Sequence, residues 1–294
     1  MSASKMYSLY PPQFAPPKES LEFALSDEFY AYSCCVTLYH TGDPDEADFL
    51  ARHREPVNIG GQSLYDDALL LEHFGYQESG FNTFYNYDNS VLPPQISIVC
   101  KTPVLNSKQD VHIINSIGYA FDSEDQPHCM FYNDTIFDTI IQDFTKTFDM
   151  VFQAAKDYNL SHIALCYLGG GCFSKHYPSD YLNTLYLPCL RASLGKLDWK
   201  PESIGLMGKV EPRVCNGISH LLQAFDIPFR KLGNVPDILT DPDTLYQNAW
   251  DPHSMVGNGN KGDYSLDGFM GRSTLMHFLC WPVTNPNITY KSID

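Results

Sequence analysis

The sequence has 294 residues, 44% hydrophobic and 18% charged, a composition typical of a globular protein rather than a disordered chain. Its formal net charge of −16 argues against binding to duplex nucleic acid or to an anionic membrane, because both need a basic face. No apolar run reaches the ~20 residues of a membrane span, and residues 1–17 lack the apolar core of a signal peptide. We therefore expect a cytoplasmic protein that binds neither nucleic acid nor membrane.

The composition changes near residue 95. A proline-rich start, an acidic run at residues 43–48 and a Tyr/Asn-rich stretch at 81–89 precede this point, with one predicted helix at 63–74. Short β-branched runs and amphipathic segments follow it. We therefore predict an irregular N-terminal extension, residues 1–95, packed on a core domain of residues 96–294.

The core domain is predicted to alternate strands and helices, which is typical of an α/β layered fold. The long segment 134–157 has apolar residues three and four positions apart, as an amphipathic helix requires. The other predicted helices are 178–194 and 218–225, and the predicted strands are 96–100, 111–115, 162–168, 204–207, 227–232 and 244–248.

Three glycines, Gly169, Gly170 and Gly171, follow the predicted strand 162–168 and precede a helix, with Cys172 and Phe173 next. Glycines at this position let backbone N–H groups approach a phosphate closely. A tight turn without a ligand is equally compatible with them, and no G-K-[ST] follows, so this is not a Walker A loop. Cys172 with a nearby histidine would suit a thiol hydrolase, but a thiol that packs or lines a ligand site is the more common case.

A second polar segment follows the predicted strand 244–248. Glycines make it flexible, and its three carboxylates suit a ligand cradle with an acid/base pair, although an Asx-rich surface loop is the alternative. The residues concerned are Asn248, Asp251, Gly257, Asn258, Gly259, Asn260, Asp263 and Asp267.

Together these segments resemble the macro domain, a family that binds ADP-ribose between two loops. The run from Pro236 to Leu239, followed by Asn248-Ala-Trp-Asp251, is similar to the family's G-D-I-T and N-A-A-N elements. Gly171-Cys-Phe-Ser174 with Tyr177-Pro178 is similar to its G-x-F-G-x-P loop, and Lys101-Thr-Pro-Val-Leu105 to its T-P stretch. The two loops occur here in the reverse order, so the resemblance implies a circularly permuted macro domain over residues 96–294.

The resemblance implies a three-layer α/β/α fold with a mixed central sheet, and roles for individual residues. Asp237, with Ile238 beside it, matches the acid that accepts the adenine amino group. Asn248 and Asp251 match the asparagines near the distal ribose, and Phe173 matches the aromatic residue there. The loop residues matched to the pyrophosphate and ribose are Gly169, Gly170, Gly171, Cys172, Gly257, Asn258, Gly259 and Asn260.

One departure from the family pattern suggests chemistry. Asp251 replaces an asparagine, and an anionic ligand that is only bound gains nothing from another negative charge, whereas a developing oxocarbenium ion does. The chain is also similar to atypical macro-like ADP-ribosyl hydrolases that include bacterial effectors, which implies the cytoplasm or nucleus of a host cell as a second location. We expect Asp251 and Asp263 to form the working pair, with Asp267 behind them, as a third partner, or only as a helix N-cap.

The expected function is thus hydrolysis of the glycosidic bond between ADP-ribose and a modified protein, without a cofactor or a recognisable metal motif. If the modified residue is an arginine, Asp263 or Asp267 would suit its guanidinium. Two alternatives stay open: a reader that binds ADP-ribose without chemistry, and an α/β protein whose loops bind another nucleotide or a protein partner.

Overall fold

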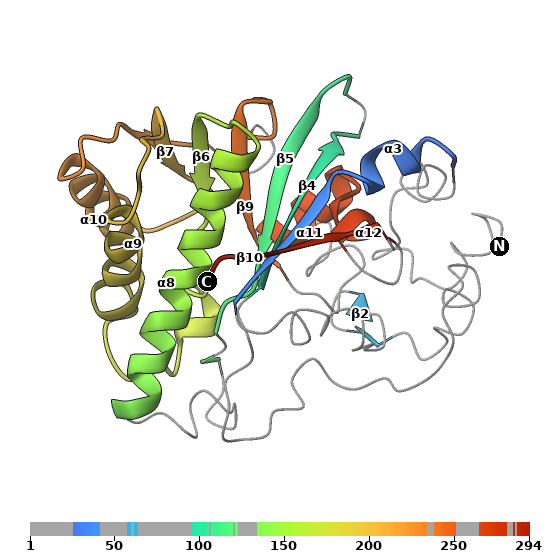
Figure 1. Cartoon of the computed structure of the whole chain (residues 1–294). Helices are drawn as coiled ribbons and strands as arrows, with labels where there is room; N and C mark the ends of the chain where they lie inside the picture. The colour runs from blue at the N-terminus through green and yellow to red at the C-terminus, as the bar shows by residue number, and fades with distance from the viewer. Residues whose placement is uncertain are drawn as a thin grey trace.

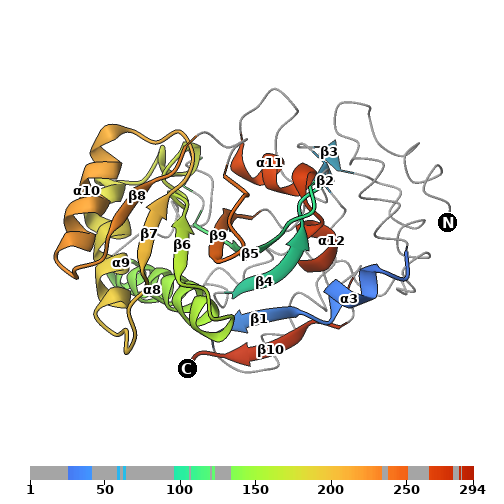
Figure 2. The same cartoon turned by 90° about the horizontal axis from the view of Figure 1, so that it is seen from above.

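The structure is a computed structural model, and it describes residues 26–41, 58–59, 62–63, 96–105, 107–119, 121–122, 134–233, 238–250, 265–280, 285 and 287–294. Its main feature is an eight-stranded sheet in the order β10-β1-β4-β5-β9-β6-β7-β8 (Figures 1 and 2). The strands are β1 (Val36–His40), β4 (Ile96–Pro103), β5 (Asp110–Ser116), β6 (His162–Leu165), β7 (Ser203–Leu206), β8 (Phe229–Lys231), β9 (Thr244–Ala249) and β10 (Thr289–Ser292). A separate two-stranded pair joins β2 (Asn58–Ile59) to β3 (Gln62–Ser63).

The sheet is mixed. Strand β4 is antiparallel to both β1 and β5, whereas β5, β9, β6, β7 and β8 all run parallel. Strand β9 comes last of these five in the chain, yet it lies between β5 and β6. The chain therefore leaves a place in the sheet when it passes from β5 to β6, and it returns to fill that place from β8.

Helices flank the sheet on two sides (Figure 2). Helices α8, α9 and α10 lie together on one side, and α11 and α12 lie on the other, against β9 and β4. None of the helices in the described ranges is long and apolar enough to cross a bilayer. The helices are α3 (Phe29–Ser33), α8 (Asp134–Asp157), α9 (Leu187–Leu194), α10 (Pro212–Gln223), α11 (Leu266–Ser273) and α12 (Met276–Cys280), with a π-helical turn at Leu182–Tyr186.

The core forms where the apolar stripe of α8 meets aromatic side chains from the segment before α9. Phe144 and Phe148 on α8 are fully buried, and their rings pack edge-on or tilted against Tyr186, while Phe144 also contacts Tyr181. Burying a side chain of this size stabilises the fold by about 1.5–3 kcal/mol. This contact explains why the residues three and four apart on α8 face inward, as the sequence predicts.

The predicted α/β fold is confirmed, and the bounds of helix 134–157 agree with the structure. Helix α10 begins at Pro212 rather than 218, because proline is favoured in a first helical turn. The predicted helix 178–194 is instead a π-helical turn followed by α9, and Asp180 accepts the free backbone N–H groups of Leu182 and Asn183 at its start. The predicted helix 63–74 lies outside the described residues apart from Ser63, which ends β3.

The sheet also extends beyond the predicted core domain. Strand β1 lies within the segment that we expect to be irregular, and it pairs with β4 over five residues. Strand β10 pairs with β1 but is exposed along its whole length, so its sequence lacks the apolar alternation of a half-buried strand. The two outer strands thus join segments from opposite ends of the chain.

Candidate functional site

The two glycine- and asparagine-containing segments begin at the same edge of the sheet. Strand β6 ends at Leu165, just before the three glycines, and strand β9 ends at Ala249, just before the predicted polar segment. The two strands are parallel neighbours, with His162 opposite Thr244 and Ala164 opposite Tyr246. Ligands of open α/β sheets commonly bind outside the carboxyl ends of such strands, where the strand order reverses. We call this region the carboxyl edge.

The three glycines at the carboxyl edge differ in what surrounds them. Gly169 has a φ of +71°, and a Cβ there would collide with the hydroxyl of Tyr181. A Cβ on Gly170 would collide with the ring of Tyr167, whereas one on Gly171 would meet nothing within 4 Å. Tight packing therefore accounts for the first two glycines, and only Gly171 borders open space.

The residues after the glycines form a short 3₁₀ turn, Cys172–Ser174, in which Cys172 and Phe173 are exposed. The Phe173 side chain is 44% exposed, which is unusual for a large apolar residue in this chain. Its carbonyl accepts the backbone N–H of Phe121 at 2.7 Å, and the carbonyl of Phe121 accepts the N–H of His176 at the same distance. These bonds fix the turn against the segment that follows β5, so the exposed ring is held on a defined backbone.

A buried polar network lies at the ends of β5 and β9. Asn115 and Asn248 are register partners on these strands, and both are fully buried. The Asn248 side-chain N–H₂ donates to Oδ1 of Asn115 at 2.8 Å and to Oδ1 of Asp267 at 2.7 Å. Asp267 lies in the first turn of α11 and is 4% exposed. The N-cap of α11 is Ser265, whose side chain accepts the N–H of Gly268, so Asp267 is not the cap.

Two further residues complete the network. The Trp250 indole N–H donates to Nδ1 of His277 at 3.1 Å, and Nε2 of His277 lies 3.3 Å from Oδ1 of Asp267. His277 belongs to α12 and is 2% exposed, while Trp250 directly follows β9 and is 5% exposed. We define the carboxyl-edge network as Asn115, Asn248, Trp250, Asp267 and His277.

Several buried polar atoms at the carboxyl edge have no hydrogen-bond partner among the described residues. They are Nδ2 of Asn115, Oδ1 of Asn248, Nε2 of His277 and Nε2 of Gln247, the last on the residue before Asn248. The other amide atom of Gln247 accepts the backbone N–H of Cys166 at 3.2 Å. An unsatisfied buried polar group costs about 1–3 kcal/mol. Four of the eight such atoms among the described residues lie at the carboxyl edge, and each needs an explanation such as a water, an ion or a functional role.

The structure describes part of the predicted site. It brings Asn248 and Asp267 into direct contact. It also places the Gly169–Phe173 turn after β6, the strand next to the one that carries Asn248. Ile238 is buried and lines a different hollow. Asp237, Asp251, Gly257, Asn258, Gly259, Asn260 and Asp263 lie outside the described residues.

Sequence reasoning missed three members of the carboxyl-edge network. His277 is not spaced from other potential metal ligands in a way that suggests a site. Trp250 indicated only that the polar segment lies next to buried sequence. Asn115 offered one usable signal, because it is an amide at the end of an otherwise β-branched buried strand. A polar residue in that position needs a partner, and the partner is on a strand that comes more than 130 residues later.

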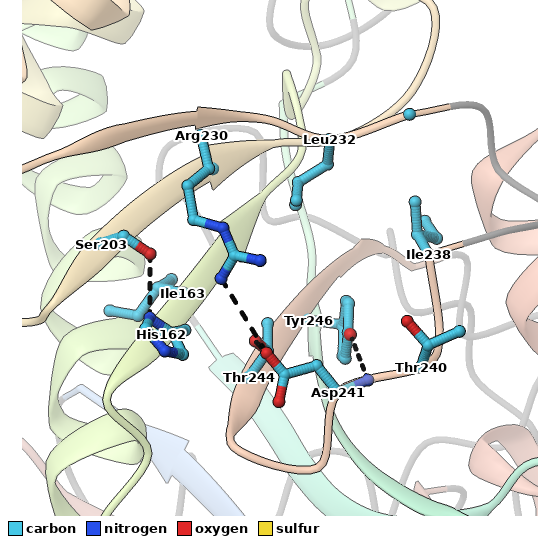
Figure 3. A pocket seen from close by; sticks show the side chains of 12 residues that line it. His162, Ile163, Ser203, Arg230, Leu232, Ile238, Thr240, Asp241, Thr244 and Tyr246 are labelled. Carbon is cyan, nitrogen blue, oxygen red and sulfur yellow. Dashed lines mark hydrogen bonds and ion pairs between the residues drawn. The ribbon is translucent and has the colours of Figure 1, made fainter.

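The hollow that contains Ile238 lies over β6–β9 (Figure 3). It is open to solvent, with roughly 440 Å³ of empty space when the open solvent is counted, and Arg230 lies 3.9 Å from Asp241 across it. The Asp241 carboxylate also accepts the backbone N–H of Asp243 and the hydroxyl of Thr244, which completes the turn that starts β9. We call this hollow the face hollow. The hydrogen-bonding groups around Asp241 in it are therefore paired with neighbouring residues.

Two observations on the described residues concern metal ligands and the Cys166 thiol. Within the described ranges, no group of three or more His, Cys, Asp or Glu side chains is arranged to hold a metal ion. Burial raises the pKa of Cys166 to about 12, so this thiol, which lies beside Gln247, stays protonated at neutral pH.

No family model matches this chain, and no match was found among curated proteins. The functional argument therefore depends on the residues and geometry of the carboxyl edge.

Proposed function

We propose that this protein is an ADP-ribosyl hydrolase with a circularly permuted, macro-like fold. One observation supports the proposal above the others: the glycine turn follows β6 and Asn248 lies near the end of β9, and these two strands are parallel neighbours although they are far apart in the chain. The resemblance requires both loops to flank one cleft despite their reversed order. If the strands followed their order in the chain, β7 and β8 would separate β6 from β9 and the two loops would not be adjacent. With β9 beside β6, the sheet satisfies the requirement.

The proposed reaction is hydrolysis of the bond between C1″ of ADP-ribose and the modified side chain. That bond breaks with oxocarbenium character at C1″; water supplies the hydroxyl to C1″ and a proton to the leaving group. Backbone N–H groups of the Gly169–Phe173 turn would bind the pyrophosphate, which suits a protein with 35 acidic and 19 basic residues. Asp251 and Asp263 remain the proposed acid/base pair.

The carboxylate of Asp267 favours a hydrolase over a reader that only binds. It is buried and accepts from the side chain of Asn248, which orients it at the carboxyl edge. A pocket that only bound an anion would be weakened by this charge, while a developing cation would be stabilised by it. We also expect the protein to act in the cytoplasm, either its own or that of a host.

The test is release of free ADP-ribose from a mono-ADP-ribosylated protein, in buffer containing EDTA because the proposed chemistry uses no metal. Calorimetric titration with ADP-ribose, ADP and AMP accompanies it. Release together with preferential binding of ADP-ribose is the expected result. Binding without release would identify a reader, and the absence of both would overturn the proposal. The Ser203→Ala variant, altered only in the face hollow, is the matched control and should behave as the wild type does.

A further inference from the structure

The chain leaves the sheet between β6 and the glycine turn, Gly169–Phe173. The pairing of β6 with β9 ends at Ala164 and Tyr246, although β9 continues beside β5 as far as Ala249. The two strands therefore separate just before the glycine turn begins. We call residues 166–168, which lie between β6 and this turn, the exit segment.

Three buried side chains bind the backbone of the exit segment. Oε1 of Gln247 accepts the N–H of Cys166 at 3.2 Å. The hydroxyl of Tyr186 donates to the carbonyl of Cys166 at 2.8 Å. The hydroxyl of Tyr181 donates to the carbonyl of Leu168, also at 2.8 Å. Burial raises the pKa of both tyrosines well above its usual value, so the hydroxyls keep their protons at neutral pH and remain donors.

The two tyrosines lie at the two ends of the π-helical turn and are five positions apart. In an α-helix, side chains five positions apart point in directions that differ by about 140°. Here the N–H of Leu187 bonds to the carbonyl of Leu182, five residues back, so the turn contains one residue more than an α-helical turn. The extra residue brings Tyr181 and Tyr186 toward the same face of the helix.

The ring contacts of the two tyrosines agree with this geometry. Tyr181 and Tyr186 both pack against Tyr167 of the exit segment and against Phe144 of α8, with ring centroids 5.1 to 6.3 Å apart. A regular α-helical turn would direct one of the two hydroxyls away from the exit segment. The π-helical turn is therefore what allows both hydroxyls to bind this segment.

The same side chains limit the position of the glycine turn. The Tyr181 hydroxyl occupies the place that a Cβ on Gly169 would need, and the Tyr167 ring occupies the place of a Cβ on Gly170. The first two glycines thus lie directly against the aromatic cluster, whereas Gly171 borders open space. A change in the cluster would be transmitted to the turn through these contacts.

We propose that Tyr181 and Tyr186 are positioning residues for the hydrolysis: through the exit segment they hold the glycine turn where its backbone N–H groups meet the pyrophosphate. This role rests on the proposed function. The two hydroxyls replace the sheet bonds that β6 no longer makes with β9, at the point where the chain enters the site. π-Helical turns occur frequently at functional sites, and the one before α9 has this specific task.

The positioning of the turn can be tested without a ligand. Tyr181→Phe and Tyr186→Phe each remove one hydroxyl and keep the ring. The N–H of Gly170, which bonds to the carbonyl of Tyr167 at 3.0 Å, reports on the turn. By NMR, we expect it to exchange at least about tenfold faster in both variants, relative to the amides of α10. Unchanged relative exchange in both variants would overturn the proposal.

The matched control is Tyr246→Phe. Tyr246 is also buried, and its hydroxyl accepts a backbone N–H, that of Asp241, but it lies in the face hollow. Loss of this hydroxyl should destabilise the protein to a similar extent and leave the relative exchange of Gly170 unchanged. Faster exchange in the control as well would show that the glycine turn responds to any loss of stability, and the proposal would fail.

Binding and turnover test the role in the reaction. In Tyr181→Phe and Tyr186→Phe, we expect the Kd for ADP-ribose to rise about tenfold while kcat stays within about threefold of the wild type, because the turn binds the pyrophosphate and not C1″. A purely structural role would leave both constants unchanged, as we expect for Tyr246→Phe. An unchanged Kd in both variants would refute the positioning role.

The two experiments separate the two claims. If the wild type neither binds ADP-ribose nor releases it, the proposed function fails, and the exchange of the Gly170 amide still decides whether the hydroxyls hold the turn. If the wild type is active and the two Phe variants match it in Kd, the function stands and the positioning role fails. Thermal unfolding of each variant, measured alongside, excludes loss of fold as the cause.

Discussion

Two clusters in this protein combine a histidine, a carboxylate and hydroxyl or amide groups, and they are built differently. In the face hollow, Asp241 accepts bonds from its own turn, and Arg230 and His162 are partly exposed. In the carboxyl-edge network, Asp267 and His277 are almost fully buried, and their partners come from separate elements. The first cluster completes a local turn, whereas the second joins β5 and β9 to α11 and α12.

The comparison suggests a criterion that distinguishes functional from structural polar groups, namely where their hydrogen-bond partners come from. Local partners satisfy the face hollow, so its removal should cost stability and little else. The carboxyl-edge network contains buried polar atoms that have no partner among the described residues, whereas Asp241 is paired within its own turn. The size of the hollow is thus a poorer guide to the site than the placement of buried, unsatisfied groups.

The largest expected effect comes from replacing the carboxylate of each cluster, Asp267 or Asp241, with an amide. Asp267→Asn should lower kcat by about 10³-fold because an amide carries no charge to stabilise the oxocarbenium ion, while ADP-ribose still binds. Asp241→Asn should leave kcat unchanged and lower only stability. Steady-state release of ADP-ribose and calorimetry measure both variants. Equal activity of the two would remove the distinction between the clusters.

The glycine turn provides the next comparison. A Cβ at Gly171 meets open space, so Gly171→Ala should change the free energy of unfolding by less than about 0.5 kcal/mol. The affinity of this variant for ADP-ribose should nevertheless fall by about tenfold. Gly170→Ala meets the Tyr167 ring and should lose about 1–3 kcal/mol of stability. Urea unfolding and calorimetry on the same samples test this. A Gly171 variant with unchanged affinity would show that the turn is only structural.

Asn248→Ala should affect both stability and activity. It leaves Asp267 and Asn115 without their shared donor, which costs about 1–3 kcal/mol. Thr244→Ala, on the same strand at the face hollow, loses a hydroxyl bond to Asp241 and should cost about 1 kcal/mol without lowering kcat. Denaturant unfolding gives the first quantity and release of ADP-ribose the second. A Thr244 variant with impaired turnover would place the face hollow in the mechanism.

The smallest effect concerns a carboxylate that belongs to neither cluster. Burial alone would raise the pKa of Asp157, but hydrogen bonds from Lys291, Tyr39 and Gln153 outweigh burial and lower it from 3.8. The stability that these bonds contribute is present above pH 3.8 and is lost as the pH falls through the lower folded value. Asp157→Asn should therefore cost about 0–1 kcal/mol at pH 7, less below pH 4, and nothing in turnover. Unfolding at both pH values checks the sign.

The sequence allowed the local part of this fold to be predicted and concealed the long-range part. Helix 134–157 and the strands around residues 96–100 and 111–115 follow from apolar periodicity, which depends only on neighbouring residues. Strand β10 could not be predicted, because its exposed side chains show no such periodicity and its pairing with β1 joins residues about 250 positions apart. The insertion of β9 between β5 and β6 was not predicted either, because it joins strands that are far apart in the chain.

The site was predictable to a similar extent. Asn248 and Asp267 were visible as polar groups beside glycines, because loop composition is a local property. The contact of Asp267 with His277 joins α11 to α12, and the Asn115–Asn248 bond depends on strand pairing, so neither has a signature in the chain order. Buried histidines are usually structural, and only the indole and carboxylate on either side of this one suggest otherwise.

Amide hydrogen exchange with and without ADP-ribose tests the central claim most directly, because it locates the ligand without relying on any variant. We predict protection of residues 169–174 and of the segment that follows β9, with no change at His162, Ser203 or Arg230 in the face hollow. Protection confined to the face hollow, or none at the carboxyl edge with ADP-ribose bound, would contradict the account.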